Sequence, residues 1–186
     1  MSAILLVVDM QKAIDTPIYA GRGQPEVEEN IAALLRHWRE LGNPVVHIRH
    51  DSMDPNSPYA PGQASHAFKA ECAPLDHEPV VEKRTNNAFI GTDLMQVLEE
   101  YSSAELVICG VLLENSVEST VRMAGNLGFM VFLPSDCVAS MARTDGRGKK
   151  WSAEDVHALT LAILDGEYAK VLTSETLTAT EGATLQ

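Results

Sequence analysis

Short apolar segments alternate with longer amphipathic segments along most of the chain, and this alternation restricts the fold more than any other feature. Apolar runs such as "AILLVVD" end in a charged or polar residue and predict strands buried on both faces, as in parallel sheets. The predicted strands cover residues 3–9, 44–50, 79–83, 104–110, 129–136 and 168–177. The predicted helices cover residues 25–42, 91–102, 114–128 and 152–166.

Strands that alternate with helices form βαβ units with right-handed crossovers. The sequence therefore predicts an α/β fold, a Rossmann-like three-layer sandwich in which helices cover both faces of a six-stranded parallel sheet. The length suits a single domain over residues 1–186, with a frayed tail from about residue 178. The Pro- and Gly-rich segment from about Asp51 to Pro79 is too long for a simple connection, which favours a functional role.

Several residues mark the expected helix ends. Gly42 follows the first predicted helix and suits the position after a C-cap. Thr92 is a candidate N-cap for the second helix. Ser152 and Asp155 have the spacing of a capping box at the start of the last helix.

Composition and cysteine usage exclude some classes of partner. The net charge of −12 argues against a nucleic-acid partner, which requires a basic face. Cys72, Cys109 and Cys137 have neither CxxC nor zinc-site spacing, which favours free thiols in a reducing compartment, with Cys72 the one expected at the surface. The N-terminal apolar run of six residues is too short for a signal sequence or a membrane span. We therefore expect a cytoplasmic protein with no membrane partner.

Ionisable and reactive side chains follow several of the predicted strands. Asp9, His50 and Lys83 end three strands, and Ser116 lies shortly after a fourth. Taken singly, Asp9 could cap a turn, Lys83 could be a solvated lysine, and Ser116 could serve the first turn of a helix. The carboxyl ends of parallel strands share one edge of the sheet, where ligands bind in such folds. Together these residues therefore predict an active site at that edge.

Four segments carry a resemblance to a known family, namely "LLVVDMQ", "VVEKRTNNAFIGTDL", "VICGVLLENSVESTVRMAGNLGF" and "PSDCVAS". In order and spacing they resemble the isochorismatase-like hydrolases, or cysteine hydrolases, which include nicotinamidases, N-carbamoylsarcosine amidohydrolases and ureide or biuret hydrolases. The resemblance covers nearly the whole chain. It implies an enzyme that cleaves a C–N bond in a small amide, ureide or imide.

The resemblance also implies roles for individual residues. Asp9 matches the catalytic aspartate, a general base and acid, and Lys83 matches the catalytic lysine. Ser116 stands where the family has its nucleophilic cysteine. The family has a cis peptide bond before the nucleophile, which corresponds to Val111–Leu112. The family's oxyanion hole corresponds to the backbone N–H groups of Leu112 and Ser116.

The sequence departs from the family pattern at several positions. A cysteine beside a lysine and a helix N-terminus has a lowered pKa and reacts as a thiolate, whereas a serine needs a base that takes its proton. Leu113 replaces the threonine usual three positions before the nucleophile, and Ile14 replaces an aromatic residue. The Asp-x-His metal motif of the nicotinamidases is absent around Asp51 to His66, so we expect no metal and no other cofactor.

Three accounts of Ser116 remain open. In the first, Ser116 replaces a cysteine, by laboratory design or natural drift, and the protein as written is weak or inactive. In the second, the chain is an isochorismatase-type vinyl-ether hydrolase, in which the aspartate protonates the substrate, water attacks and no covalent nucleophile is needed. In the third, the chain is a non-catalytic binding protein on this fold, although the intact Asp9 and Lys83 argue against it.

The residues that contact the substrate are less well determined. Each candidate also has a purely structural explanation. The candidates are Gln11, His50, Tyr59, His66, Asn87 and Leu113. The expected partner is a small-molecule substrate, and the resemblance implies a homo-oligomer, either a dimer or a tetramer.

Overall fold

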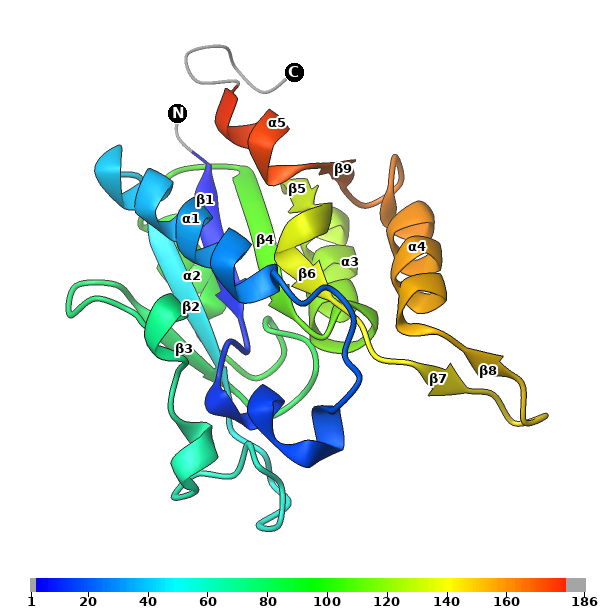
Figure 1. The fold of residues 1–186 in the computed structure, drawn as a ribbon. Coiled ribbons are helices and arrows are strands. Elements are labelled where there is room, and N and C mark those ends of the chain that lie inside the picture. Colours follow the sequence, from blue (N-terminus) through cyan, green and yellow to red (C-terminus); the bar gives the residue numbers. More distant parts are fainter. Residues whose placement is uncertain (1–2, 180–186) are drawn as a thin grey trace.

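The structure, a computed structural model, describes residues 3–179. Its centre is a parallel sheet, and the six strands predicted from the sequence form its main path in the order β3-β2-β1-β4-β5-β9 (Figure 1). These strands are β1 (Ile4–Val8), β2 (Val45–His50), β3 (Val80–Lys83), β4 (Glu105–Val111), β5 (Met130–Pro134) and β9 (Lys170–Leu172). A seventh strand, β6 (Val138–Ala139), adds a short parallel pair with β4. The predicted α/β fold with a parallel sheet is confirmed.

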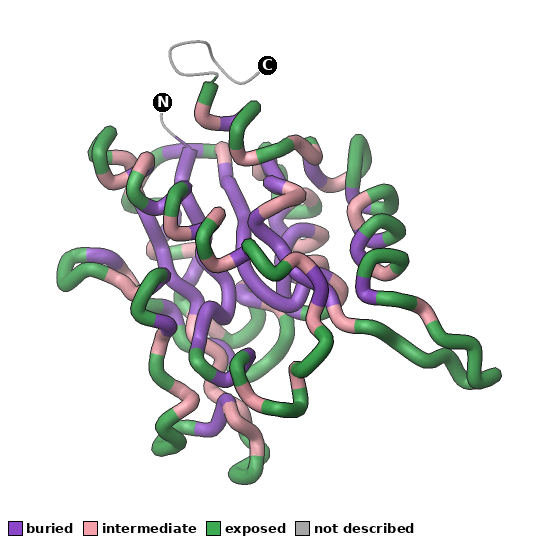
Figure 2. Tube along the Cα trace, viewed as in Figure 1, coloured by how far each residue is buried: buried purple, intermediate pink, exposed green. Residues whose placement is uncertain are grey.

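Helices cover both faces of the sheet. Alternate residues of the central strands point to opposite faces, so Leu5 and Val7 pack with α1 (Val27–Glu40) and α5 (Ser174–Ala179). Leu6 and Val8 pack on the other face, where the helices are α2 (Leu94–Glu99), α3 (Glu118–Asn126) and α4 (Ala153–Leu164). Figure 2 shows the buried strands at the centre of the molecule. No helix in the described range is long and apolar enough to cross a bilayer.

Short helical turns fill the connections and shape the edge of the sheet at which the strands end. The turns are η1 (Lys12–Asp15), η2 (Pro17–Tyr19), η3 (Ala64–His66), η4 (Ala70–Cys72), the π-turn η5 (Leu113–Val117) and η6 (Ser135–Cys137). Two of them, η3 and η4, lie within the long segment that follows β2.

The ends of several helices match the sequence analysis. Gly42 follows the C-cap of α1 with a φ of 67°, and Ser152 and Asp155 form both hydrogen bonds of a capping box on α4. The N-cap of α2, however, is Asp93. The hydroxyl of Thr92 donates to the carbonyl of Ala88 at 2.6 Å, so it ties the helix to the preceding loop.

Two segments near the C-terminus differ from the prediction. The predicted strand over 168–177 is wrong beyond Leu172, because the Asp136 carboxylate accepts a hydrogen bond of 2.8 Å from the Ser174 N–H and α5 begins there. Residues 178–179 of the predicted frayed tail belong to α5, and the rest of that tail lies outside the described residues. The hairpin of β7 (Arg143–Thr144) and β8 (Lys150–Trp151) has no counterpart among the predicted strands.

The order of the strands places β1 and β4 side by side at the centre, where the direction of winding reverses. The crevice beyond the carboxyl ends of such a strand pair is the usual ligand site in these sheets. Gly110 allows the two strands to meet there. Its φ is 125°, and a Cβ atom on it would lie 2.0 Å from the carbonyl oxygen of Val8. Only glycine fits this position without movement of the backbone.

We therefore expect Gly110→Ala to destabilise the fold by at least about 2 kcal/mol, since the new methyl group would force β1 and β4 apart. Urea denaturation of both proteins measures this change. Gly146→Ala is a matched control, because a Cβ atom there would meet no atom within 4 Å. Equal losses in the two variants would contradict the close approach of the strands.

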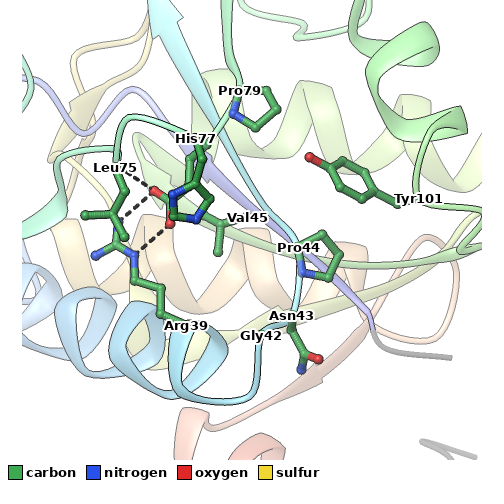
Figure 3. Close-up of a pocket in the computed structure, with 10 residues that line it drawn as sticks. Arg39, Gly42, Asn43, Pro44, Val45, Leu75, His77, Pro79 and Tyr101 are labelled. Carbon is green, nitrogen blue, oxygen red and sulfur yellow. Dashed lines mark hydrogen bonds and ion pairs between the residues drawn. The ribbon is translucent and has the colours of Figure 1, made fainter.

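At the opposite edge of the sheet, a cavity of about 370 Å³ lies against the amino ends of β2 and β3 (Figure 3). Arg39, Pro44, Glu78 and Tyr101 are among the residues that line it. The Arg39 guanidinium donates to both carboxylate oxygens of Glu78, at 2.7 and 2.8 Å. Behind this pair, the Nε2 atom of the fully buried His47 lies 3.0 Å from a Glu78 oxygen.

The environment of His47 predicts acid sensitivity. Burial lowers the pKa of His47 to about 4, although the Glu78 carboxylate opposes the shift. Burial alone would raise the pKa of Glu78, but hydrogen bonds from Arg39 and the Leu75 N–H outweigh it and lower the pKa to about 2. In the unfolded chain a histidine gains its proton near pH 6.5, whereas the folded protein resists this proton until about pH 4.

Stability should therefore fall by up to about 3 kcal/mol as the pH falls from 6.5 to 4, since the unfolded state binds more protons in that window. Urea denaturation at several pH values measures the slope. His47→Gln should be less stable at neutral pH but lose less stability on acidification. A variant with the same acid slope as the parent would show that His47 is not the responsible group.

Candidate active site

Asp9 comes directly after β1, and its backbone has a φ of 55°. This left-handed conformation is uncommon, and aspartate is one of the few non-glycine residues that tolerate it. The Asp9 N–H donates to the Ile48 carbonyl at 3.0 Å, which holds the turn against β2. The residue is only 4% exposed. The apolar strand and this turn thus place a carboxylate at the carboxyl edge of the sheet, almost out of contact with water.

Lys83 ends β3 and is fully buried. Its Nζ atom lies 2.8 Å from Asp9 Oδ2 and 3.1 Å from Ser116 Oγ. It also lies 3.1 Å from the Thr85 carbonyl oxygen and 3.3 Å from His50 Nδ1. An ammonium group has three protons to donate, so these four acceptors use its full hydrogen-bonding capacity. The charge of Lys83 is therefore paired and directed at both Asp9 and Ser116.

Ser116 lies in the π-turn η5, which joins β4 to α3, and is 6% exposed. The peptide bond Val111–Leu112 that precedes this turn is cis, as the family resemblance implied. The Thr120 hydroxyl donates to the Ser116 carbonyl at 2.7 Å and accepts from the Ala88 N–H at 3.1 Å. The turn is thereby tied both to α3 and to the loop after Lys83.

One carboxylate oxygen of Asp9 is free to accept a proton. Among the described residues, the buried Asp9 Oδ1 has no hydrogen-bond partner, while Oδ2 accepts from Lys83. Asp9 can therefore take or give a proton at Oδ1 without losing its ion pair. The Lys83 ammonium donates to Ser116 Oγ, and a donated proton stabilises negative charge on the atom that receives it. The geometry suits a nucleophile that reacts as an anion.

The aromatic side chains of Tyr19, His50 and Tyr59 form a cluster within electrostatic reach of Asp9. The Tyr59 ring contacts those of His50 and Tyr19, with ring centroids 5.6 and 6.0 Å apart. Burial, with the nearby Asp9 charge, raises the pKa of both tyrosines. Burial and the Lys83 charge lower the pKa of His50, although Asp9 and Asp51 oppose the shift. These directions favour the neutral form of all three side chains at pH 7.

Tyr19 lies near the candidate site, against Tyr59, and its sequence position did not predict this. The position close after Asp9 at which the family has an aromatic residue is Ile14, which is buried in the core. The turn η2 instead brings Tyr19 back toward the end of β1. A tyrosine soon after the first strand was the available signal, but only the tertiary path of the loop shows where it lies.

Gln11 and His66 have structural contacts in the same region. The buried Gln11 amide accepts from the His50 N–H at 2.7 Å and donates to the carbonyls of His50 and His66, at 3.2 and 2.8 Å. His66 Nε2 lies 2.7 Å from Asp51 Oδ1. Gln11 thus fastens the long segment after β2 to the end of the strand. Within residues 3–179, no three side chains of His, Cys, Asp or Glu form a group able to hold a metal ion.

Two other candidate substrate residues contact protein groups. Leu113 is fully buried in the core on the α3 face of the sheet, so the structure does not favour contact with a substrate. The Asn87 amide donates to the Ser119 carbonyl at 2.8 Å and accepts from the Phe89 N–H at 2.9 Å, which ties the loop after β3 to α3. Sequence position suggested proximity for both residues but could not show which way the side chains face.

The cysteines are unsuited to replace the nucleophile. All three are free and buried, so the expected surface position of Cys72 is wrong. Burial raises the pKa of Cys72 to about 12 and raises the pKa values of Cys109 and Cys137. A buried thiol with a raised pKa does not form a reactive thiolate at neutral pH.

Comparisons with known proteins identify the family of the chain. The uncharacterized isochorismatase family protein YrdC of Bacillus subtilis (strain 168) is 37% identical over 173 residues, which cover 93% of this chain and 92% of YrdC. A streptothricin hydrolase of Streptomyces noursei is 36% identical over 138 residues, which cover 73% of this chain and 49% of that protein.

A solved structure assigned to the isochorismatase family, from Chromobacterium violaceum ATCC 12472, has a TM-score of 0.92 and 50% identity, and the match covers 96% of this chain and 92% of that one. The family model for the isochorismatase domain matches residues 3–176. The resemblance inferred from the four sequence segments is confirmed, and the chain belongs to the isochorismatase family of hydrolases.

Proposed function

We propose that this chain is a hydrolase of the cysteine-hydrolase type that cleaves a C–N bond in a small amide, ureide or imide, with position 116 as its nucleophile position. One observation carries the proposal: the buried Lys83 ammonium donates to both Asp9 and Ser116, while Asp9 Oδ1 remains open. This arrangement supplies a charge that stabilises an anionic nucleophile and a carboxylate that moves a proton.

The reaction is simplest with a thiol at position 116. Asp9 takes the thiol proton, and Lys83 stabilises the thiolate. The thiolate attacks the substrate carbonyl carbon, and the N–H groups of Leu112 and residue 116 are the proposed donors to the oxyanion. Asp9 then gives its proton to the leaving nitrogen as the C–N bond breaks. Water, deprotonated by Asp9, attacks the thioester and releases the acid, and the proton returns to the thiol.

Serine is a poor nucleophile in this setting. A hydroxyl is much less acidic than a thiol and needs a base that accepts its proton during the attack. Serine hydrolases use an imidazole for this step. In the described part of the chain, the His50 side chain forms a hydrogen bond with Lys83 and none with Ser116. We therefore propose that Ser116 stands in for a cysteine and that the protein as written is weak or inactive.

The open Asp9 Oδ1 also favours a second candidate, the vinyl-ether reaction. In that reaction a protonated Asp9 would transfer its proton to a substrate carbon, and water would attack the resulting cation without a covalent intermediate. Ser116 would then serve only as a small polar neighbour of Lys83. The third hypothesis is a non-catalytic binding protein. In such a protein the buried Asp9–Lys83 pair would have no chemical role.

The proposed substrate is small and uncharged near the scissile bond. The pKa directions of His50, Tyr19 and Tyr59, which lie within electrostatic reach of Asp9, favour neutral side chains, and Lys83 is already paired. Arg122, a residue that could bind a carboxylate, instead contacts Glu118 at 2.7 Å and the ring of Tyr168. Gln11 and Asn87 act as positioning residues in this account. Streptothricin, the compound in the name of one relative, belongs in the test panel.

We expect Ser116→Cys to raise hydrolysis of a responsive amide, ureide or imide by about 10⁴-fold or more, which corresponds to about 5.5 kcal/mol of barrier. Steady-state kinetics on a panel of such compounds, streptothricin and isochorismate measure the change. Ser119→Cys is the matched control, because it places a thiol three residues further along, on α3. The control should give no gain.

Adding Asp9→Asn to Ser116→Cys should remove the gained activity, since the amide cannot carry the proton to the leaving nitrogen. The vinyl-ether reading predicts a different pattern. In that case the serine protein already hydrolyses isochorismate, Ser116→Cys changes little, and Asp9→Asn abolishes the reaction. Inactivity of both the serine and the cysteine forms on the whole panel would instead favour a binding protein.

A further inference from the structure

Arg143 lies beside the turn that carries position 116. Strands β4 and β6 run parallel, and their last residues pair with each other at the carboxyl edge of the sheet. The segments that follow them, η5 and residues 140–144, therefore begin side by side. The Met141 N–H donates to Glu114 Oε1 at 3.2 Å, which joins the two segments directly. This arrangement brings Arg143 to the border of the candidate active site.

The guanidinium of Arg143 is held by the two residues that precede position 116. Its Nη2 atom donates to Glu114 Oε1 at 2.7 Å. In the amide orientation that satisfies both of its polar atoms, the Asn115 oxygen accepts from the same Nη2 atom at 3.2 Å. The Glu114 side chain is only 9% exposed, whereas that of Arg143 is 45% exposed. Glu114 is thus a buried anchor that leaves part of the guanidinium open to solvent.

Arg143 has donors left for a ligand. Within residues 3–179, its Nε and Nη1 atoms take part in no hydrogen bond. Two other cations of this region differ in that respect. Lys83 already has four acceptors within 3.3 Å, and the unpartnered Nη1 atom of Arg22 is buried. Arg143 therefore combines a positive charge, free N–H groups and access from solvent.

Tyr19 lies within electrostatic reach of both Asp9 and Arg143. Burial and then the Asp9 charge raise the pKa of Tyr19, and the Arg143 charge opposes this shift. The Gly23 N–H donates to the Ser140 carbonyl at 2.9 Å, so the loop after Tyr19 runs next to the segment before Arg143. A ligand beside Tyr19 would therefore experience both the catalytic carboxylate and the guanidinium.

We propose that Arg143 is a specificity-determining residue that binds a carboxylate of the substrate, away from the scissile C–N bond. This inference rests on the proposed function and narrows the substrate to a small amide that carries a carboxylate a few bonds from the scissile carbonyl. The free N–H groups on Nε and Nη1 donate to the carboxylate oxygens, while Nη2 stays on Glu114. Glu114 is then a positioning residue, because it acts only through Arg143.

The charge of the chain makes a local cation necessary for an acidic substrate. The net charge of −12 repels anions, and Asp9 and Glu114 add negative charge at the site itself. A guanidinium keeps its proton at all relevant pH values and forms strong charge-assisted hydrogen bonds with carboxylates. Arg143 supplies this attraction at the border of the site, so the groups near the scissile bond can remain uncharged.

Binding to the serine protein tests the proposal without turnover. The probes are malonamate, succinamate and glutaramate, each compared with its diamide, in which a neutral amide of the same size replaces the carboxylate. Ligand-induced shifts in NMR spectra give the dissociation constants. At least one acid should bind about tenfold or more tightly than its diamide, and Arg143→Gln should remove this preference. Arg143→Lys should keep part of it, because the positive charge remains.

Arg147→Gln is the matched control, because it removes one positive charge from the exposed turn of the same hairpin. This variant should keep the preference for the acid. Three results would overturn the proposal. They are no preference in the parent protein, a preference that survives Arg143→Gln, and an equal loss of acid and diamide binding in that variant. If Arg143→Gln fails to fold, Glu114→Gln with Arg143→Gln removes both charges together and replaces it.

Glu114→Gln alone tests the positioning role. It should weaken binding of the acid and leave binding of the diamide unchanged, since only the acid uses Arg143. Equal effects on both ligands would contradict this role and indicate a purely structural contact.

Kinetics in the Ser116→Cys background separate this inference from the proposed function. There, Arg143→Gln should raise KM for the acid about tenfold or more and leave kcat and the hydrolysis of the diamide unchanged. Inactivity of Ser116→Cys on every probe, with the binding preference intact, would contradict the proposed reaction but support Arg143 as the carboxylate-binding residue. An active cysteine form without the preference would contradict the role of Arg143 alone.

Discussion

The buried ion pair between Lys83 and Asp9 is the interaction on which the rest of the site depends. Lys83 is fully buried and Asp9 is only 4% exposed, and an unpaired charge in such a position is costly. Removing one member of a buried ion pair typically lowers the stability of the fold by about 3–5 kcal/mol. The same contact therefore stabilises the fold and positions the candidate catalytic groups. The pair also holds Ser116 in place, because the same Lys83 ammonium donates a hydrogen bond to Ser116 Oγ. A single cation thus joins the ends of β3 and β1 to the turn after β4.

The sheet makes this convergence possible. The side chain of Lys83 spans from β3 past the end of β2 to β1, and the central pair of β1 and β4 brings Asp9 and the turn η5 to one crevice. Gly110 permits the close approach of these strands. The amide of Gln11 secures the end of β2 and the long segment that follows it. The ends of β1, β2 and β4 therefore both hold the sheet together and position the candidate catalytic residues.

The strands and their alternation with helices could be predicted from the sequence, because strands buried on both faces are continuous apolar runs. The candidate catalytic groups could be predicted because each is a polar residue at or shortly after the end of such a run. The positions of Tyr19 and Leu113 depend on how turns fold back in three dimensions, and no local pattern shows this. Cys72 lies in a polar segment yet is buried, because η4 packs against α1. The strand predicted over 168–177 ended early because Asp136, distant in sequence, begins α5 at Ser174.

In the proposed mechanism, the Asp9–Lys83 pair stabilises a thiolate at position 116. The most direct test is the pH dependence of iodoacetamide alkylation in Ser116→Cys, since the three native thiols are buried and have raised pKa values. We predict an apparent pKa for the introduced thiol below about 7.5, and a return to about 8.5 or higher when Lys83→Met is added. A pKa near 8.5 or above in Ser116→Cys, unchanged by the loss of Lys83, would contradict the claim.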